Sequence, residues 1–377
     1  MKNKSLNYVT NFNEDAVGGG WDGINNRMFN ALKDKINCRY VGPINPPSLL
    51  IQKIQSKLLR LLFSKGHFFF FSNKRLNKIA ELISDKQING PVFYFGATPW
   101  VKIKNNHKYY TYLDVCFHDY VKLFSSFDSF DIDDLQRISN LEAEFLSNAQ
   151  HIFWGSTWAQ KRTEEIYNRK FVNSTVISTG GVIDIPLKAS SPENRFEKKK
   201  ILFISTNFEA KGGRYAFEAI EILNSLGYKF TLEIVGSQPQ PECLEYNFVK
   251  YHGYLNKTNT MDLQKLNKLY DEAFLLLHPT SMDTMGAVIA EAGYFGLPCL
   301  APDAFGIPDL IIDGQTGLLI KTPINVQEII EKIEQCVNSK TFYLNLVNGV
   351  NVFMRNDRSW NSIANKISKV INEDINS

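Results

Sequence analysis

The chain has 377 residues, and its 42 lysines and arginines against 39 aspartates and glutamates leave a formal net charge of only +3. That balance excludes a polycation that binds nucleic acid through charge alone, so no nucleic-acid partner is expected. Hydrophobic residues make up 44% and charged residues 21%, which is typical of a globular protein and excludes a disordered or collagen-like chain. At about 150 residues per domain, the length predicts two domains.

Cysteine usage and hydropathy both favour a cytoplasmic chain. The five cysteines are an odd number without C-x-x-C spacing, which indicates reduced thiols. The first seven residues are polar and lead into a short strand, unlike a secretory signal. No segment reaches about 18 consecutive apolar residues, so we expect no membrane span.

In the first half, short apolar strands alternate with helical stretches. A strand over 6–9 is followed by a polar loop with three glycines and a helix over 22–32. Further strands are expected over 39–41, 91–95, 109–113, 151–154 and 174–177, and helices over 79–84 and 135–146. Alternation of this kind indicates parallel strands joined by crossover helices, an α/β architecture.

A break in the pattern separates this series from a second one. Prolines, serines and a lysine run lie between 184 and 200, and we expect the interdomain linker at 191–200. Strands follow over 201–205, 230–235, 248–251, 273–277, 299–301 and 317–320, with helices over 214–226 and 286–295. We therefore predict Rossmann-like domains over 1–190 and 201–355 and a C-terminal helix over 356–377 that packs back on the first domain. Ligands of such sheets bind at the C-terminal ends of the strands.

Three glycines, Gly18, Gly20 and Gly23, have the G-x-G-x-x-G spacing of dinucleotide-binding folds. A true fingerprint follows its strand directly, and strand two then ends in a carboxylate, whereas this strand two ends at Val41 without one. We therefore expect no nicotinamide, flavin or other cofactor. Two interpretations remain equal: a loop in which Gly20 lets the backbone approach a ligand, and a plain turn before a helix.

Asp131-Ile132-Asp133 has the D-x-D spacing of a metal site. A helix is expected to begin near Leu135, and carboxylates at a helix start cap its exposed N–H groups, so we favour capping over metal binding. No other cluster has metal-ligand spacing, and we expect no metal.

The most informative segment runs from His278 to Pro298 and predicts a strand, a polar loop and a helix that begins after a glycine. Free N–H groups at that helix start would form an anion site. They belong to Thr284, Met285, Gly286 and Ala287. Asp283 and Glu291, eight positions apart, suit a polyhydroxylated ligand whose phosphates sit between them. The alternative is a loop cap at Asp283 and a solvated Glu291, and the apolar neighbours of Glu291 argue against its second part.

Lys211, Gly212 and Gly213 follow the first strand of the second series and precede a helix. A lysine at this point can neutralise a diphosphate. Taken alone, such a motif most often marks a turn. It gains weight because a doubly wound sheet would place it beside the loop at Asp283.

Together these motifs resemble those of the retaining GT-B glycosyltransferases of the large group 1 family (family 4). The matching stretches cover most of 200–322 in order: Lys211-Gly212-Gly213, Val235-Gly236, His252-Gly253-Tyr254, Asp283 to Glu291 as the E-x7-E element, Gly296-Leu297-Pro298, Gly306-Ile307-Pro308-Asp309 and Asp313-Gly314-x-x-Gly317-Leu318-Leu319. The first half is similar to the family over 112–117 and 144–159. The resemblance implies the GT-B fold, two Rossmann-like doubly wound domains facing a central cleft.

The resemblance also implies residue roles. Glu291 would bind the nucleotide ribose, Asp283 the donor-sugar hydroxyls and Lys211 the diphosphate, while Asp114 stands where family members place a His or Asp near the reacting sugar. Further donor contacts would come from Thr284, Met285, Gly286, Ala287, Thr206, Gly212 and Gly20. Two positions depart from the family pattern: Asp283 replaces a glutamate, and Thr206 replaces an arginine, which leaves Lys211 with more of the phosphate charge.

The activity implied is that of a metal-independent, retaining hexosyl-type transferase (EC 2.4). Its partners would be a nucleotide-sugar donor and a glycan or lipid-linked acceptor in bacterial surface-polysaccharide or lipopolysaccharide biosynthesis. A nucleotide-sugar epimerase of the same fold is disfavoured by the E-x7-E spacing, and a phosphorylase lacks an evident cofactor-bearing lysine motif. A non-catalytic nucleotide-sugar-binding partner is a further alternative, supported by Asp283 and Thr206.

A basic segment over 51–90 carries eight lysines or arginines and two acids, and apolar residues at 50, 54, 58, 61 and 62 give part of it a helical face. Such a segment can lie on an anionic membrane, which would bring the chain to the inner face of the membrane, where lipid-linked acceptors are found. An ordinary helix with its apolar face in the core and a solvated basic side is equally compatible with the sequence.

Overall fold

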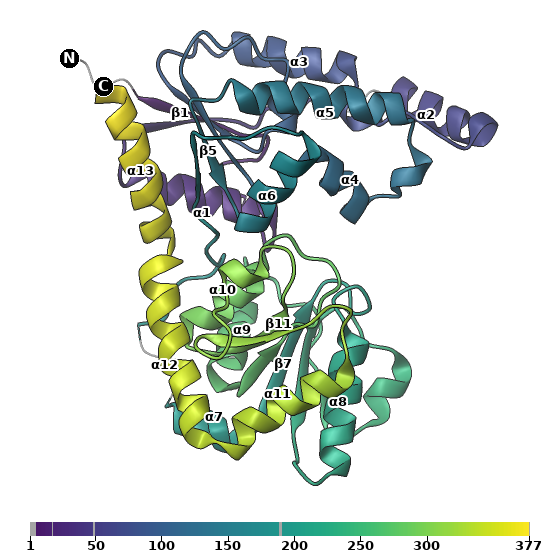
Figure 1. Cartoon of the computed structure of the whole chain (residues 1–377), viewed down its shortest axis with the longest axis vertical. Coiled ribbons are helices and arrows are strands. Elements are labelled where there is room, and N and C mark those ends of the chain that lie inside the picture. The colour runs from purple at the N-terminus through teal and green to yellow at the C-terminus, as the bar shows by residue number, and fades with distance from the viewer. Residues whose placement is uncertain (1–4, 17, 48–49, 188–190, 377) are drawn as a thin grey trace. The chain divides into compact units, whose positions relative to one another are not determined.

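The computed structural model describes residues 5–16, 18–47, 50–187 and 191–376. The chain divides into two compact units. Unit 1 comprises Met1–Ala16, Asn25–Ile177 and Ala364–Ser377, and unit 2 comprises Val17–Ile24 and Ser178–Ile363. Each unit contains a six-stranded parallel sheet with helices around it (Figure 1).

The sheet of unit 1 has the strand order β2-β1-β3-β4-β5-β6. Its strands are β1 (Leu6–Val9), β2 (Cys38–Val41), β3 (Val92–Phe95), β4 (Tyr109–Leu113), β5 (His151–Trp154) and β6 (Ser174–Val176). Every residue of β1, β3 and β4 is buried, as expected for parallel strands covered on both faces. The predicted α/β alternation of the first half is therefore confirmed.

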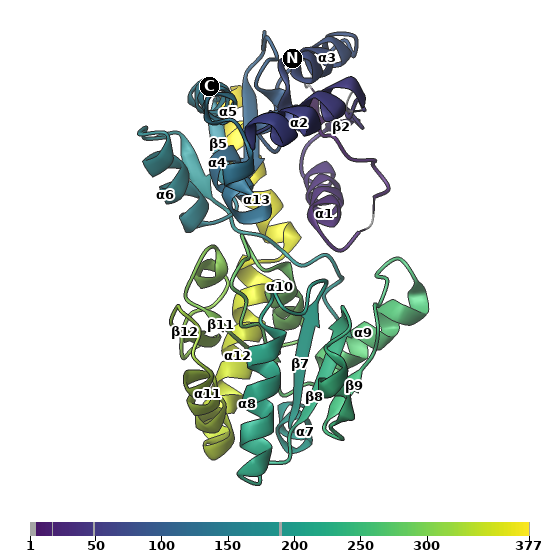
Figure 2. The same ribbon diagram turned by 90° about the vertical axis from the view of Figure 1, so that its right-hand side faces the viewer.

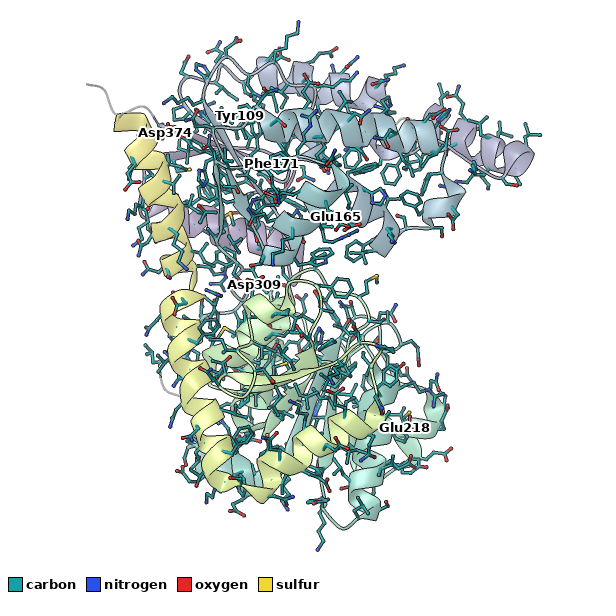
Figure 3. The ribbon with its side chains drawn as sticks, in the orientation of Figure 1. Tyr109, Glu165, Phe171, Glu218, Asp309 and Asp374 are labelled. Atoms are coloured by element: carbon teal, nitrogen blue, oxygen red, sulfur yellow. The ribbon has the colours of Figure 1, made fainter. Side chains whose placement is uncertain are left out.

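The helices that lie entirely in unit 1 are α2 (Leu50–Phe63), α3 (Asn73–Ser84), α4 (Phe117–Phe124), α5 (Ile132–Ser147) and α6 (Thr157–Ile166). Two more helices begin in unit 2 and continue into unit 1, namely α1 (Trp21–Lys33) and α13 (Trp360–Asn376). Short 3-10 turns occur at Phe69–Phe71, Thr98–Trp100 and Phe127–Ser129. The end of α13 is held to the sheet by Asp374, labelled in Figure 3, which accepts hydrogen bonds from Lys108, Tyr110 and Gln150.

The sheet of unit 2 has the order β12-β11-β10-β7-β8-β9. Its strands are β7 (Lys200–Ser205), β8 (Thr231–Gly236), β9 (Val249–Tyr251), β10 (Leu275–Leu277), β11 (Cys299–Pro302) and β12 (Gly317–Ile320). Its helices are α7 (Pro192–Lys198), α8 (Gly213–Ser225), α9 (Thr260–Glu272), α10 (Ala287–Tyr294), α11 (Val326–Asn338) and α12 (Lys340–Asp357), with 3-10 turns at Pro241–Glu245 and Ile307–Asp309.

Alternate strand residues of unit 2 face two separate apolar layers. Ile201 and Phe203 pack with residues of α8 and α11, which lie side by side (Figure 2). Leu202 packs in the opposite layer with residues of α9 and α10. Both faces of the sheet are thereby covered, which leaves the loops at the strand ends to carry polar side chains.

The expected linker at 191–200 is a helix for most of its length, since α7 spans Pro192–Lys198. Arg195 on α7 is buried and donates to the carbonyl oxygens of Asp271 at 2.7 Å and Phe295 at 2.6 Å. This charged stretch is therefore a packed element of unit 2. The prolines, serines and lysine run predicted a linker here, whereas two carbonyl oxygens of unit 2 accept hydrogen bonds from the buried arginine.

None of the helices in the described part of the chain is both long and apolar enough to cross a membrane.

Candidate functional site

The loops after β7 and β10 meet at the point where the strand order of unit 2 reverses. The two strands pair in parallel, Ile201 with Leu275 and Leu202 with Leu276. The approach of their loops is so close that a Cβ on Gly212 would lie 1.9 Å from the carbonyl oxygen of Pro279. Gly212 also has a φ of +79°, so the K-G-G turn requires a glycine there.

Lys211 and Asp283 are brought together by this approach, as the sequence predicts. The Lys211 ammonium lies 2.9 Å from Oδ2 of Asp283 and also donates to the carbonyl oxygen of Met282 at 2.5 Å. Both side chains are partly exposed, at 22% for Lys211 and 17% for Asp283. A ligand can therefore reach this ion pair.

His278 is a third member of the cluster that the sequence analysis did not single out. Its ring is buried and its Nε2 lies 3.0 Å from Oδ2 of Asp283, so the ring donates to the carboxylate. Burial alone would raise the pKa of the Asp283 carboxyl, but the hydrogen bond from His278 and the charge of Lys211 hold this pKa well below its ordinary value. Asp283 is therefore a fixed anion at neutral pH.

Two of the four loop N–H groups predicted to be free at the start of α10, those of Met285 and Gly286, are occupied in this structure. Oδ1 of Asp283 accepts from the N–H groups of Gly286 at 2.8 Å and Met285 at 3.3 Å. Thr284 is buried, and its carbonyl oxygen accepts from Gly306 at 3.0 Å. The aspartate is short enough to fold back onto its own loop, which the pattern of residue types does not reveal. Ala287 is the first residue of α10.

Glu291 is fully buried on α10, so the solvated alternative is wrong. Oε1 accepts from the ammonium of Lys257 at 2.5 Å and from the N–H of Val182 at 3.3 Å. Oε2 accepts from the Tyr270 hydroxyl at 2.7 Å. Burial, reinforced by the Glu291 charge, raises the pKa of Tyr270 well above its ordinary value, so this hydroxyl stays a donor.

The segment next to Val182 is also tied to α10. The N–H of Gly181 donates to the Tyr294 hydroxyl at 2.9 Å, and its carbonyl oxygen accepts from the Trp360 indole at 2.7 Å. A Cβ on Gly181 would lie 2.7 Å from Cγ of Glu291. Glu291 is thus packed tightly against the backbone that follows residue 177, where the chain passes from unit 1 to unit 2.

The glycine loop before α1 was predicted to be either a plain turn or a loop in which Gly20 lets the backbone approach a ligand. A Cβ on Gly23 would lie 2.2 Å from the carbonyl oxygen of Gly18, and one on Gly18 would meet the Asp22 carboxylate, so these two glycines close a tight turn. Over Gly20, by contrast, the nearest atom to such a Cβ is 3.8 Å away. Packing does not require a glycine at Gly20. Thr206 is exposed at the end of β7.

Asp114 belongs to unit 1, where it follows β4 and is half-buried. The start of α4, three residues later, is anchored by the fully buried Glu142. This carboxylate accepts from the N–H of Phe117 at 2.7 Å, from Thr98 at 2.5 Å and from Tyr167 at 2.6 Å. The loop that carries Asp114 is therefore held at its far end by a buried network.

Asp131 caps α5, as predicted, and its Oδ1 accepts from the N–H of Asp134 at 3.0 Å. Among the residues that the structure describes, no group of three or more His, Cys, Asp or Glu side chains is arranged to hold a metal ion.

Comparison with known proteins shows what this chain is similar to. The family described as Glycosyl transferases group 1 matches residues 187–351. An uncharacterized 41.2 kDa protein in the cps region of Klebsiella pneumoniae is 28% identical over 158 residues, 41% of this chain and 40% of that protein. The lipopolysaccharide glucosyltransferase WaaG of Escherichia coli (strain K12) is 28% identical over 142 residues, 37% of this chain and 38% of WaaG. The matched regions are thus less than half of these relatives.

Two solved structures are similar over nearly the whole chain. Sucrose-phosphate synthase from Thermosynechococcus elongatus has a TM-score of 0.70 at 16% identity, covering 98% of this chain and 99% of its own. The HepE protein of Anabaena in complex with UDP has a TM-score of 0.67 at 16% identity, covering 98% and 100%. This likeness shows a GT-B fold of two Rossmann-like α/β units. The match to the group 1 family lies within unit 2.

Proposed function

We propose that the chain is a retaining, metal-independent glycosyltransferase of the E-x7-E type (family 4). It would transfer a hexosyl group from a nucleotide-diphosphate sugar to a glycan or lipid-linked acceptor in the assembly of a bacterial surface polysaccharide. The observation that carries the proposal is a pair of carboxylate–ammonium contacts in the loops of unit 2, Lys211 with Asp283 and Lys257 with Glu291. The group 1 match over 187–351 contains both pairs.

Each group in these pairs suits one part of the donor. Glu291 can accept hydrogen bonds from the two ribose hydroxyls, and Asp283 from hydroxyls of the sugar. Lys211 can exchange its contact with Asp283 for the diphosphate, which carries more negative charge. Lys211 and Asp283 pair with each other when no donor is bound. A bound nucleotide sugar therefore offers each of them a new partner, the diphosphate for Lys211 and the sugar hydroxyls for Asp283.

In the chemical step, the bond between the anomeric carbon and the β-phosphate oxygen breaks as the acceptor hydroxyl attacks from the same face. The acceptor proton passes to the departing phosphate oxygen. Because attack and departure occur on the same face, the anomeric configuration is unchanged. Charge that develops on the diphosphate is stabilised by Lys211, without a metal ion. Asp114 would act from unit 1 near the reacting sugar.

To test the proposal, turnover of the nucleotide sugar that binds is measured in EDTA. Proton NMR then gives the anomeric configuration of the product. We expect transfer to continue in EDTA and the product to keep the anomeric configuration of the donor. Asp283→Ala should abolish transfer, whereas the exposed control Asp303→Ala should not. Loss of all turnover in EDTA, or an inverted product, would contradict the mechanism. Cellular function that survives Asp283→Ala although transfer is lost would favour a non-catalytic binding protein.

The acceptor side involves α2, which carries a set of exposed apolar residues. Six of them are between 51% and 75% exposed: Leu50, Ile51, Ile54, Leu58, Leu61 and Leu62. They fall within an arc of about 120° on the helix, opposite Ser56, which donates to the carbonyl oxygen of His67 at 2.8 Å. Figure 1 shows α2 as the outermost helix on one side of unit 1, and Figure 2 shows it in front when seen from that side.

This arrangement contradicts the core-facing alternative and supports contact with a membrane. Helix α2 contains Lys53, Lys57 and Arg60 and no acidic residue. A helix with an outward apolar stripe bordered by cations fits an anionic lipid surface. We therefore place the enzyme in the cytoplasm, at the inner face of the membrane, where lipid-linked acceptors are found.

Sedimentation with vesicles of phosphatidylglycerol and phosphatidylcholine in low salt tests this contact. The wild-type chain should sediment with mixed vesicles and less with pure phosphatidylcholine. Leu58→Glu with Leu61→Glu should abolish sedimentation, whereas Val172→Glu, at an exposed residue outside α2, should not. Equal sedimentation of all variants, or a dimer held by α2 in light scattering, would overturn the membrane assignment.

A further inference from the structure

The carboxylate of Glu291 is already occupied by three donors. They are the Lys257 ammonium, the Tyr270 hydroxyl and the Val182 N–H. An ionised carboxylate offers about four acceptor positions, and two vicinal hydroxyls of a ribose would need two of them. One of the three donors must therefore leave before a ribose can bind in full.

Lys257 is the donor that can leave. Tyr270 is fully buried on α9, and the N–H of Val182 belongs to the backbone. Lys257 lies between β9 and α9, in a stretch where Tyr254 is 66% exposed, and its own side chain retains 13% exposure. A lysine has four rotatable side-chain bonds, so its ammonium can move several ångström without displacing the backbone.

The glycine loop before α1 lies next to this ammonium. A Cβ built on Gly19 would be 3.9 Å from the Nζ of Lys257, an ordinary contact distance. A side chain longer than alanine at this position would enter the space next to the ammonium. The glycine loop before α1 thus borders the path along which Lys257 would move.

We propose that Lys257 is a displaceable counter-ion that makes this site selective for nucleotides over nucleosides. The ribose hydroxyls would replace the ammonium on Glu291, and the ammonium would move to the diphosphate of the same ligand. This inference rests on the proposed function, in which Glu291 binds the ribose. Lys257 is then a specificity-determining residue in addition to Lys211.

The selectivity follows from the charge balance of the two states. Separating the buried pair leaves an ammonium without its carboxylate, which is unfavourable unless another anion replaces it. A nucleoside diphosphate carries that anion within its own structure, whereas a nucleoside does not. Lys257 therefore opposes the binding of any ribose that arrives without phosphate.

The experiment is calorimetric titration of UDP, GDP, ADP, CDP and dTDP and of the matching nucleosides into wild type, Lys257→Met and Lys257→Gln. Lys265→Met, at an exposed position of α9, is the control. For the base that binds wild type, Lys257→Met should weaken the diphosphate by about tenfold or more, the scale of one charge-assisted hydrogen bond. The nucleoside affinity should not fall, so the ratio of the two affinities shrinks.

Lys257→Gln keeps a hydrogen-bond donor for Glu291 but lacks the charge, so it should fold and show the same loss for the diphosphate. Equal weakening of nucleoside and diphosphate in both variants would mean that Lys257 only supports the fold, and would overturn the inference. If wild type binds none of UDP, GDP, ADP, CDP and dTDP, the proposed function itself fails. Binding by wild type with an unchanged ratio in the variants overturns this inference alone.

Discussion

A Cβ added to Gly212 would lie 1.9 Å from the carbonyl oxygen of Pro279. This close approach joins the loop of Lys211 to the loop of Asp283 and is the structural reason for the K-G-G motif. Both atoms in the clash belong to, or are fixed by, the backbone, so neither can move without displacing its loop.

Gly212→Ala should therefore destabilise the protein and displace Lys211. The left-handed conformation costs an alanine about 1–2 kcal/mol, and the clash adds a comparable amount. Gly227 has a φ of +92° with nothing within 4 Å of a Cβ, so Gly227→Ala measures the conformational part alone. Urea unfolding should show a larger loss for Gly212→Ala. Equal losses would contradict the close approach.

Lys211→Met should lower kcat/KM by about 10²–10³, the usual effect of removing one preorganised group that stabilises developing negative charge. Thr206 supplies no second cation at the position where the family has an arginine. Lys250→Met, at an exposed position of β9, is the control. Rates within threefold of wild type for Lys211→Met would rule out a role for this ammonium at the diphosphate.

Acid stability should depend on Asp283. The pKa of this carboxyl is lower in the folded state than in the unfolded state, so its contribution to stability is complete above the unfolded pKa of about 4. The contribution is lost as the pH falls below that value toward the folded pKa. Melting temperatures should therefore decrease more steeply between pH 5 and pH 3, roughly, in wild type than in Asp283→Asn. Parallel curves would argue against the ion pair.

Tyr270→Phe should lower the free energy of unfolding by about 1.5–3 kcal/mol, because it removes a buried donor to a charged acceptor. Tyr343 is a matched control, since its buried hydroxyl donates to a neutral acceptor, the carbonyl oxygen of Phe274, at 3.0 Å. Tyr343→Phe should cost about 0.5–1.5 kcal/mol. Chemical denaturation compares the two, and a smaller loss for Tyr270→Phe would contradict a strong hydrogen bond from Tyr270 to Glu291.

The order of the strands could be predicted because short apolar runs report burial directly, whereas helices α9, α11 and α12 were not among the expected elements. The contact of Lys211 with Asp283 followed from the doubly wound topology, which places the ends of β7 and β10 together. The site roles themselves remain predictions. Asp114 lies in unit 1.

Other features lay beyond sequence patterns. Lys257 lies 34 positions before Glu291 in a polar loop, and no periodicity links the two residues. The hydrogen bonds from Asp283 to its own loop depend on side-chain rotamers. The outward stripe of α2 has the same helical period as a core-facing one. The exposure of its apolar residues and the hydrogen bond from Ser56 to His67 indicate which side faces the protein.

The most direct test of the account is a thermal-shift panel of UDP, GDP, ADP, CMP and dTDP sugars in EDTA, with wild type and Glu291→Gln. A ligand that binds only the folded state raises the melting temperature. We predict that one nucleotide sugar stabilises wild type at millimolar concentration and that the shift disappears in Glu291→Gln. A shift of equal size in the variant, or no shift with any of the five, would contradict a nucleotide-sugar site at Glu291.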